Sequence, residues 1–138
     1  MIASEIAKES IRAHEGLRLL MYQDTVGKWT VGYGHNIEER GISPDVAEDM
    51  LEEDVEIAES DAIDVYGDLW ANLSVNRQAV LIEMSFQLGR NRLSGFQKFL
   101  AASRAGDHDD AAREMMSSQW AVQVPKRAKT LSERYLLG

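Results

Sequence analysis

The sequence contains no cysteine among its 138 residues. A disulfide framework and a thiolate metal site are therefore both excluded. The chain also lacks any run of 18 apolar residues, so we expect no transmembrane helix. Its first ten residues, MIASEIAKES, contain neither a basic start nor an apolar core, and we expect no cleaved signal or membrane anchor there.

Basic residues are scarce: 15 Lys and Arg stand against 23 Asp and Glu, which gives a formal net charge of −8. Binding to nucleic acid depends on neutralising phosphates, so this balance argues against a nucleic-acid partner. We also expect no stable membrane insertion, no cofactor and a monomeric chain. The remaining composition, 44% hydrophobic and 28% charged, is ordinary for a globular protein of one domain, residues 1–138, which can be built as two lobes.

The most informative stretch runs from Glu15 to His35 and reads EGLRLLMYQDTVGKWTVGYGH. Apolar residues recur at helical spacing before it, which predicts a helix over Ser4 to His14 with Ser4 as its N-cap. Gly16 is suited to ending that helix. Glu15 then lies at the negative end of the helix dipole, where the charged form of a carboxylate is disfavoured. This position suits a general acid.

After Gly16 the pattern alternates. Leu17 to Tyr22 and the stretch starting at Trp29 are predicted strands, and the residues between them have turn chemistry. A hairpin centred on Gly27 places Asp24 opposite Thr30, with Gly32 and Gly34 on the same face as Thr30, where a ligand could approach closely. An acid at a helix end beside a second carboxylate and a hydroxyl is a set of groups suited to hydrolysing a glycosidic bond.

Glu15, Asp24 and Thr30, spaced by eight and five residues, resemble the catalytic signature of the T-even bacteriophage lysozymes. Two further blocks in family order extend the resemblance over nearly the whole chain: Phe86-Gln87-Leu88-Gly89 with Gly95-Phe96, and Gln119-Trp120 with Val124-Pro125-Lys126-Arg127-Ala128. The resemblance implies a lysozyme-like, predominantly helical α+β fold. Its small hairpin lobe covers about 15–42, a connecting helix about 43–64, and a helical lobe about 65–138 together with the first helix.

The resemblance also implies an endolysin-type muramidase that hydrolyses the β-1,4 bond between N-acetylmuramic acid and N-acetylglucosamine of bacterial peptidoglycan with inversion. Glu15 would donate the proton, Asp24, on a more exposed hairpin, would remain ionised, and Thr30 would position the water. Asn36, Phe86 and Gln119 are the expected substrate-binding residues. The implied location is the host cytoplasm until a holin opens the membrane, or else a virion protein of which this chain is a module.

Several residues have a structural interpretation. We expect His35 to pair with a carboxylate of the connecting helix, for which the resemblance implies Asp54, and a metal-ligand role for His35 is the less favoured alternative. Trp70 and Trp120 are expected in the core instead of stacking on sugars. Arg127 is expected to anchor the last helix to an acidic group.

After the hairpin we expect a short loop from Asn36 to Gly41 and then several separate helices, one of them a shorter helix with Leu93, Phe96, Phe99 and Leu100 that ends near Gly106. Ser43-Pro44 opens a helix to about residue 63, whose acidic face is either solvated or, less plausibly, a calcium site. Ser74 and Asp107 are the N-caps of two later helices, the second with Met115 and Met116 facing inward, and a last helix follows Pro125.

Two other function classes remain open. A lytic transglycosylase would use one glutamate and the substrate's own hydroxyl, but it would not need Asp24 and Thr30. A peptidoglycan-binding module without activity would be compatible with the acidic surface, although the complete triad argues against it.

Overall fold

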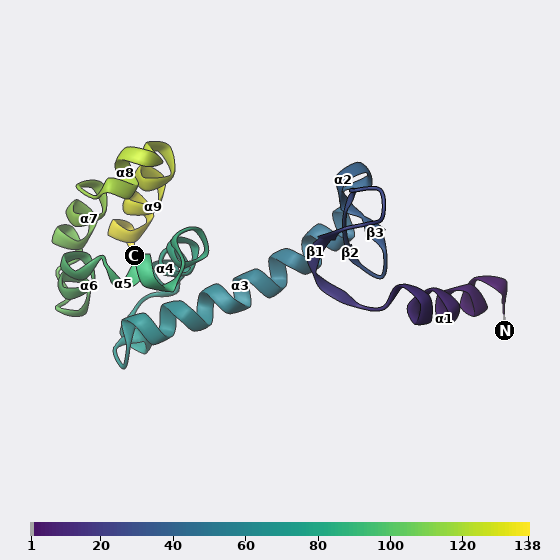
Figure 1. Ribbon diagram of the computed structural model, residues 1–138. Coiled ribbons are helices and arrows are strands. Elements are labelled where there is room, and N and C mark those ends of the chain that lie inside the picture. The colour runs from purple at the N-terminus through teal and green to yellow at the C-terminus, as the bar shows by residue number, and fades with distance from the viewer. Residues whose placement is uncertain (1) are drawn as a thin grey trace. The chain divides into compact units, whose positions relative to one another are not determined.

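The computed structural model describes residues 2–138 and divides into two compact units, the first ending at Asp49 and the second running from Met50 to Gly138. Figure 1 shows the helices and strands in chain order. A small antiparallel sheet in the first unit and many helices in the second confirm the predicted helix-rich α+β class. Among residues 2–138, no helix combines the length and apolar character needed to cross a bilayer.

The first unit has three short strands in the order β1-β2-β3. Its elements are α1 (Ala3–Glu15), β1 (Arg18–Gln23), β2 (Trp29–Gly32), β3 (His35–Asn36) and α2 (Ile37–Arg40). Helix α1 ends at Glu15, as predicted. Its start differs from the prediction: Ile2 is the N-cap, and Ser4 lies inside the first turn, because the backbone already becomes helical at Ala3.

The hairpin between β1 and β2 is centred one residue earlier than predicted. Tyr22 lies opposite Thr30 and Gln23 opposite Trp29, so Asp24 faces Lys28 and not Thr30. The carboxylate of Asp24 causes this shift, because it accepts hydrogen bonds from two backbone amides and closes the turn around Val26.

The predicted loop from Asn36 to Gly41 is also wrong. Strand β3 pairs with β2, with Asn36 opposite Thr30, and helix α2 follows at once. Asn36 caps α2 through its Oδ1, which accepts a hydrogen bond of 3.1 Å from the Glu39 amide. The first unit is therefore more elaborate than a single hairpin.

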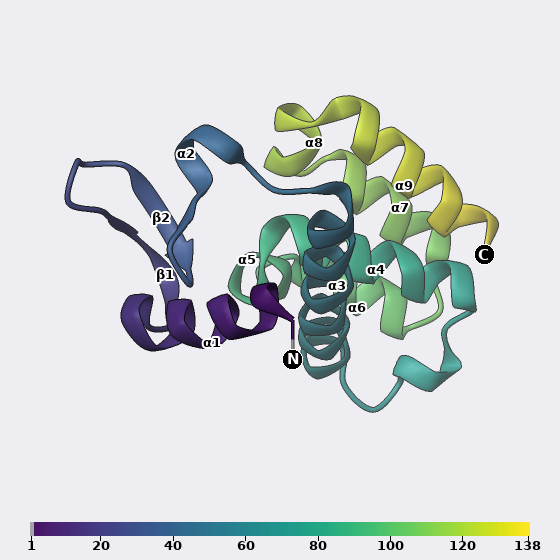
Figure 2. The same cartoon turned by 90° about the vertical axis from the view of Figure 1, so that its right-hand side faces the viewer.

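Helix α3 (Pro44–Tyr66) begins in the first unit and continues into the second. The second unit then contains η1 (Trp70–Asn72), α4 (Val75–Leu88), α5 (Arg90–Ser94), α6 (Gln97–Arg104), α7 (His108–Met116), α8 (Gln119–Gln123) and α9 (Pro125–Leu137). The predicted caps Ser74 and Asp107 each accept a hydrogen bond from an amide of the first turn. Helix α9 contacts both α4 and α7, and Figure 2 shows the three helices together.

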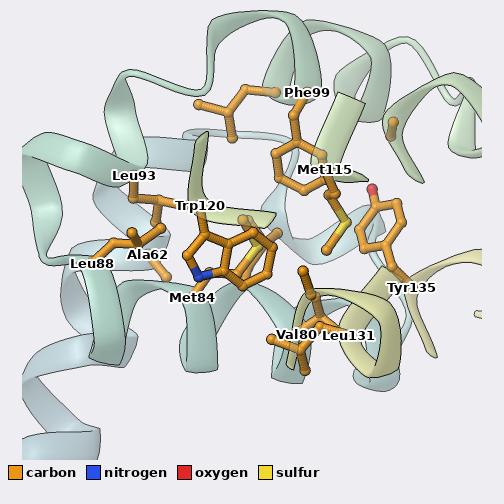
Figure 3. Close-up of a cluster of buried hydrophobic side chains, with 14 of the residues drawn as sticks. Ala62, Val80, Met84, Leu88, Leu93, Phe99, Met115, Trp120, Leu131 and Tyr135 are labelled. Carbon is orange, nitrogen blue, oxygen red and sulfur yellow. The ribbon is translucent and has the colours of Figure 1, made fainter. Parts of the chain in front are cut away.

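The core of the second unit is built around large side chains that solvent does not reach (Figure 3). They include Trp120, Tyr135, Phe99, Leu81, Met84, Leu93, Met115, Leu131 and Val80. A buried side chain of this kind contributes about 1.5–3 kcal/mol relative to an exposed one. Trp120 is thus a core residue, as predicted, and its indole Nε1 donates to Gln87 at 2.8 Å. Trp70 packs against the same core.

Two details of this unit differ from expectation. Met116 is exposed, because α7 ends there and only Met115 of the pair faces the core. The single helix predicted from Leu93 is two, α5 and α6, because the chain leaves helical geometry at Phe96. Arg127 donates to Glu83 at 2.8 Å, which confirms that it joins α9 to an acidic group.

Candidate active site

Glu15 is the last residue of α1, and Gly16 ends the helix with a positive φ of 70°. The Gly16 amide donates to the carbonyl of Arg12 at 3.0 Å, which closes the final turn. The side chain of Glu15 is exposed and leaves the helix toward the sheet of the same unit. This is the helix-end position that the sequence predicted.

Gly34 lies directly against the carboxyl group of Glu15. A Cβ atom built on Gly34 would come within 2.9 Å of Glu15 Cδ and 3.0 Å of Oε2, closer than real Cβ contacts. Gly34 also has a φ of 74°, in the region that favours glycine. Only a glycine at this position leaves the Glu15 carboxylate where it is.

Asp24 uses one carboxylate oxygen to hold its own turn. Its Oδ1 accepts hydrogen bonds from the amides of Val26 and Lys28, each at 2.9 Å. Within residues 2–138, no side chain or amide hydrogen-bonds to its Oδ2. Asp24 is half-buried whereas Glu15 is exposed, so the expectation that Asp24 is the more exposed of the two is wrong. The turn amides that enclose Oδ1 explain its burial.

Thr30 lies in the middle strand and is only 3% exposed. Its hydroxyl donates to the carbonyl of Lys28 at 2.9 Å, so its single hydrogen is already engaged. Toward any further polar group Thr30 Oγ1 can act only as an acceptor.

Glu15, Asp24 and Thr30 line one hollow of about 600 Å³, formed within the first unit. The other lining residues are Arg18, Tyr22, Gln23, Thr25 and Gly34. Although Thr30 does not face Asp24 in the strand register, the shifted hairpin still brings all three predicted residues to the same hollow. Gly32, which was expected on the same face as Thr30, does not line the hollow.

Sequence reasoning missed Arg18 and Tyr22. The Arg18 guanidinium lies over the Tyr22 ring, 4.3 Å from its centroid. Their even spacing within one strand was an available signal, because residues separated by an even number share a face. Together they give the hollow a cationic and aromatic side, suited to a polar ligand with an apolar face.

The predicted substrate-binding residues lie at three different places. Asn36 caps α2 in the first unit. In the second unit, Phe86 is 44% exposed and borders a hollow of about 230 Å³, and Gln119 borders another of about 530 Å³ beside Trp120. Their roles toward substrate stay predictions.

The predicted pair of His35 and Asp54 joins residues of different units and stays a prediction. Within the first unit, His35 Nε2 lies 2.6 Å from the carbonyl oxygen of Gly41, so the ring donates there. Across residues 2–138, no group of three or more His, Asp or Glu side chains is arranged to hold a metal ion.

Comparison with known families decides the classification. The model of the family "Phage lysozyme" matches residues 12–135, a span that contains all three residues of the hollow discussed above. The chain belongs to this phage lysozyme family. Membership makes it a glycoside hydrolase of the lysozyme type, acting on bacterial peptidoglycan.

Individual relatives of this phage lysozyme agree with the family match. A probable T4-type lysozyme of Dictyostelium discoideum is 29% identical over 159 residues, which cover 95% of this chain and 94% of the relative. An endolysin of Acyrthosiphon pisum secondary endosymbiont phage 1 is 32% identical over 131 residues, which cover 92% of this chain and 86% of the relative. The pre-baseplate central spike protein of Enterobacteria phage T4 is 29% identical and matches 94% of this chain, but only 27% of its own length is covered.

Proposed function

We propose that this lysozyme is an endolysin-type muramidase that cleaves the β-1,4 bond between N-acetylmuramic acid and N-acetylglucosamine by direct attack of water, with inversion. The observation that carries the proposal is the hollow of the first unit, which is lined by Glu15, Asp24 and Thr30. A proton donor, an ionised carboxylate and a hydroxyl at one site are the groups that this reaction requires.

Glu15 is the proposed acid. Its proton passes to the glycosidic oxygen as the bond from that oxygen to the anomeric carbon breaks. Gly34 supports this role, because the absence of a side chain at that position leaves room for the carboxyl group and keeps it accessible.

Asp24 and Thr30 are proposed to hold the attacking water. Asp24 Oδ1 is engaged by two amides, which leaves Oδ2 to accept one hydrogen from the water. The Thr30 hydroxyl donates its own hydrogen bond to the carbonyl oxygen of Lys28, so Oγ1 accepts the second hydrogen of the water. A water that donates both hydrogens directs a lone pair away from the two acceptors, toward the anomeric carbon. As the new bond forms, the carboxylate of Asp24 takes the water's proton.

The decisive experiment is anomer-resolved NMR of the products released from a soluble peptidoglycan glycan by the parent chain and by Glu15→Gln. We expect an initial α-anomer from the parent and a loss of at least about 100-fold in rate for the variant, the size that removal of a general acid produces. An initial β-anomer would mean retention and would make Asp24 a nucleophile.

Two other outcomes would change the assignment. A 1,6-anhydromuramic acid end would indicate transglycosylation. Absence of product from the parent, with retained binding to cell walls, would indicate a binding module. The proposed location is the host cytoplasm before holin-dependent release, and a module of a virion protein is the alternative that the spike protein supports.

A further inference from the structure

Lys28 is bonded through its backbone to both residues that are proposed to hold the water. Its amide donates to Asp24 Oδ1 at 2.9 Å, and its carbonyl oxygen accepts from the Thr30 hydroxyl at 2.9 Å. The same carbonyl accepts from the Asp24 amide, also at 2.9 Å. The position of one peptide segment therefore sets the positions of both functional side chains.

The side chain of Lys28 reaches the carboxylates of helix α2. Its Nζ lies 2.9 Å from Glu39 Oε1 and 3.3 Å from Glu38 Oε2. The hydrogen bond with Glu39, and then that with Glu38, raise the pKa of Lys28 above its ordinary value, so the ammonium stays charged under any assay condition near neutrality.

Helix α2 is itself tied to the strand beside Thr30. Asn36 lies opposite Thr30 across β2 and β3, its Oδ1 accepts from the Glu39 amide, and its Nδ2 donates to Glu39 Oε2 at 3.3 Å. The contacts thus form a closed ring from Thr30 to Lys28, Glu39, Asn36 and back. A ring constrains the Lys28 peptide from two sides, whereas a hairpin turn alone would hold it only through β1 and β2.

We propose that Lys28 is a positioning residue: the ion pairs of its ammonium with Glu38 and Glu39 fix the peptide that orients Asp24 and Thr30 toward the attacking water. This inference rests on the proposed function of those two residues. Lys28 does not line the hollow, so it acts through them and not on the substrate.

The expected effect is on the rate of the chemical step. Lys28→Met keeps the backbone and most of the side-chain length but removes both ion pairs. We expect kcat to fall about two- to five-fold with KM unchanged, because partly exposed ion pairs contribute modestly. The same loss of kcat is expected for the double variant Glu38→Gln with Glu39→Gln, since it removes both ion pairs by neutralising the carboxylates instead of the ammonium.

Two further variants separate positioning from general stability. Lys28→Arg retains the charge and should keep most of the parent kcat. Lys8→Met removes the same charge from a second exposed pair, in which Lys8 Nζ lies 2.8 Å from Glu5, and should match the parent. In 1 M NaCl, which screens ion pairs, the kcat ratio of parent to Lys28→Met should approach one.

The assay is turnover of soluble peptidoglycan glycan, with the thermal unfolding midpoint measured for every variant. A kcat of Lys28→Met equal to the parent's, or a loss that Lys8→Met shares, would overturn the inference. A loss that Lys28→Arg does not recover would also overturn it. The same assay tests the proposed function separately. The proposed function is contradicted if the parent shows no turnover, or if Asp24→Asn turns over substrate as fast as the parent.

Discussion

Asp24 divides its two carboxylate oxygens between two tasks. Oδ1 holds the turn through the amides of Val26 and Lys28, and Oδ2 is left for the reaction that we propose. Because these two amides hold Oδ1, the orientation of the carboxylate follows the geometry of the turn. A hairpin this short can therefore present both of the residues that we propose to hold the water.

At the residue scale, the sequence predicted which three side chains lie at one hollow. Glu15, Asp24 and Thr30 are close in sequence, so a helix end followed by a hairpin brings them together even when the register is off by one. The role of Lys28 could not be predicted in the same way. Its side-chain partners lie on α2, and a four-residue helix is too short to show a helical period.

Gly34 offers a direct test at the residue scale. In Gly34→Ala, the new Cβ would collide with the Glu15 carboxyl group, and the positive φ adds strain of about 1–3 kcal/mol. We expect kcat/KM on soluble glycan to fall at least about ten-fold. Gly67→Ala is the matched control, because Gly67 has a φ of 89° but its Cβ would meet nothing within 4 Å. Equal losses in the two variants would show that backbone strain alone is responsible.

At the scale of elements, the longest were the easiest to predict. Helices α3, α4 and α7 begin after a side chain that caps them, α9 begins at a proline, and each was expected close to its observed start. Strand β3 and helix α8 were missed, since two and five residues do not define a period. The register of the hairpin was missed for a different reason: it is determined by the backbone hydrogen bonds that the Asp24 carboxylate accepts, and not by the strand pattern.

The contact between α7 and α9 should make the second unit sensitive to acid. Burial, followed by the charge of Arg77, lowers the pKa of His108, whose Nδ1 lies 3.3 Å from the Tyr135 hydroxyl. The unfolded chain then binds this proton at a higher pH than the folded chain does. The contribution to the free energy of unfolding is therefore present above about pH 6.5 and is lost as the pH falls through the lowered folded pKa.

Denaturant unfolding of the parent and His108→Gln at pH 7.5 and pH 5.0 checks this expectation. The parent should lose more unfolding free energy between the two values than His108→Gln does. His14→Gln should behave like the parent, because His14 is exposed at the end of α1. A parent and a His108→Gln variant with equal losses would show that His108 does not carry the acid sensitivity.

At the scale of the whole molecule, the net charge is unexpected, because an anionic substrate would favour a cationic enzyme and this chain is acidic. The net charge is −8, and α3 contains no basic residue to offset its carboxylates. Long-range attraction to an anionic cell wall is therefore absent, and repulsion acts over about 30 Å at 0.01 M salt but only about 8 Å at 0.15 M.

Activity on intact walls should accordingly rise between about 10 mM and 150 mM NaCl, as screening shortens the repulsion. Neutralising three exposed carboxylates of α3, in a variant with Glu52→Gln, Glu56→Gln and Glu59→Gln, should reduce this dependence. Initial rates of wall solubilisation measure it. A rate that falls steadily with salt, as for a cationic enzyme, would contradict the expectation.

The turn from Asp24 to Thr30 has one more consequence. Its hydrogen bonds join residues that are two to four positions apart, so the contact order of the proposed catalytic turn is very low. Hairpins of this kind form within about 1–10 μs, whereas the core around Trp120 must bring distant helices together. The geometry that we propose to hold the water is therefore encoded within a short segment, and folding can establish it before the distant helices of the core have come together.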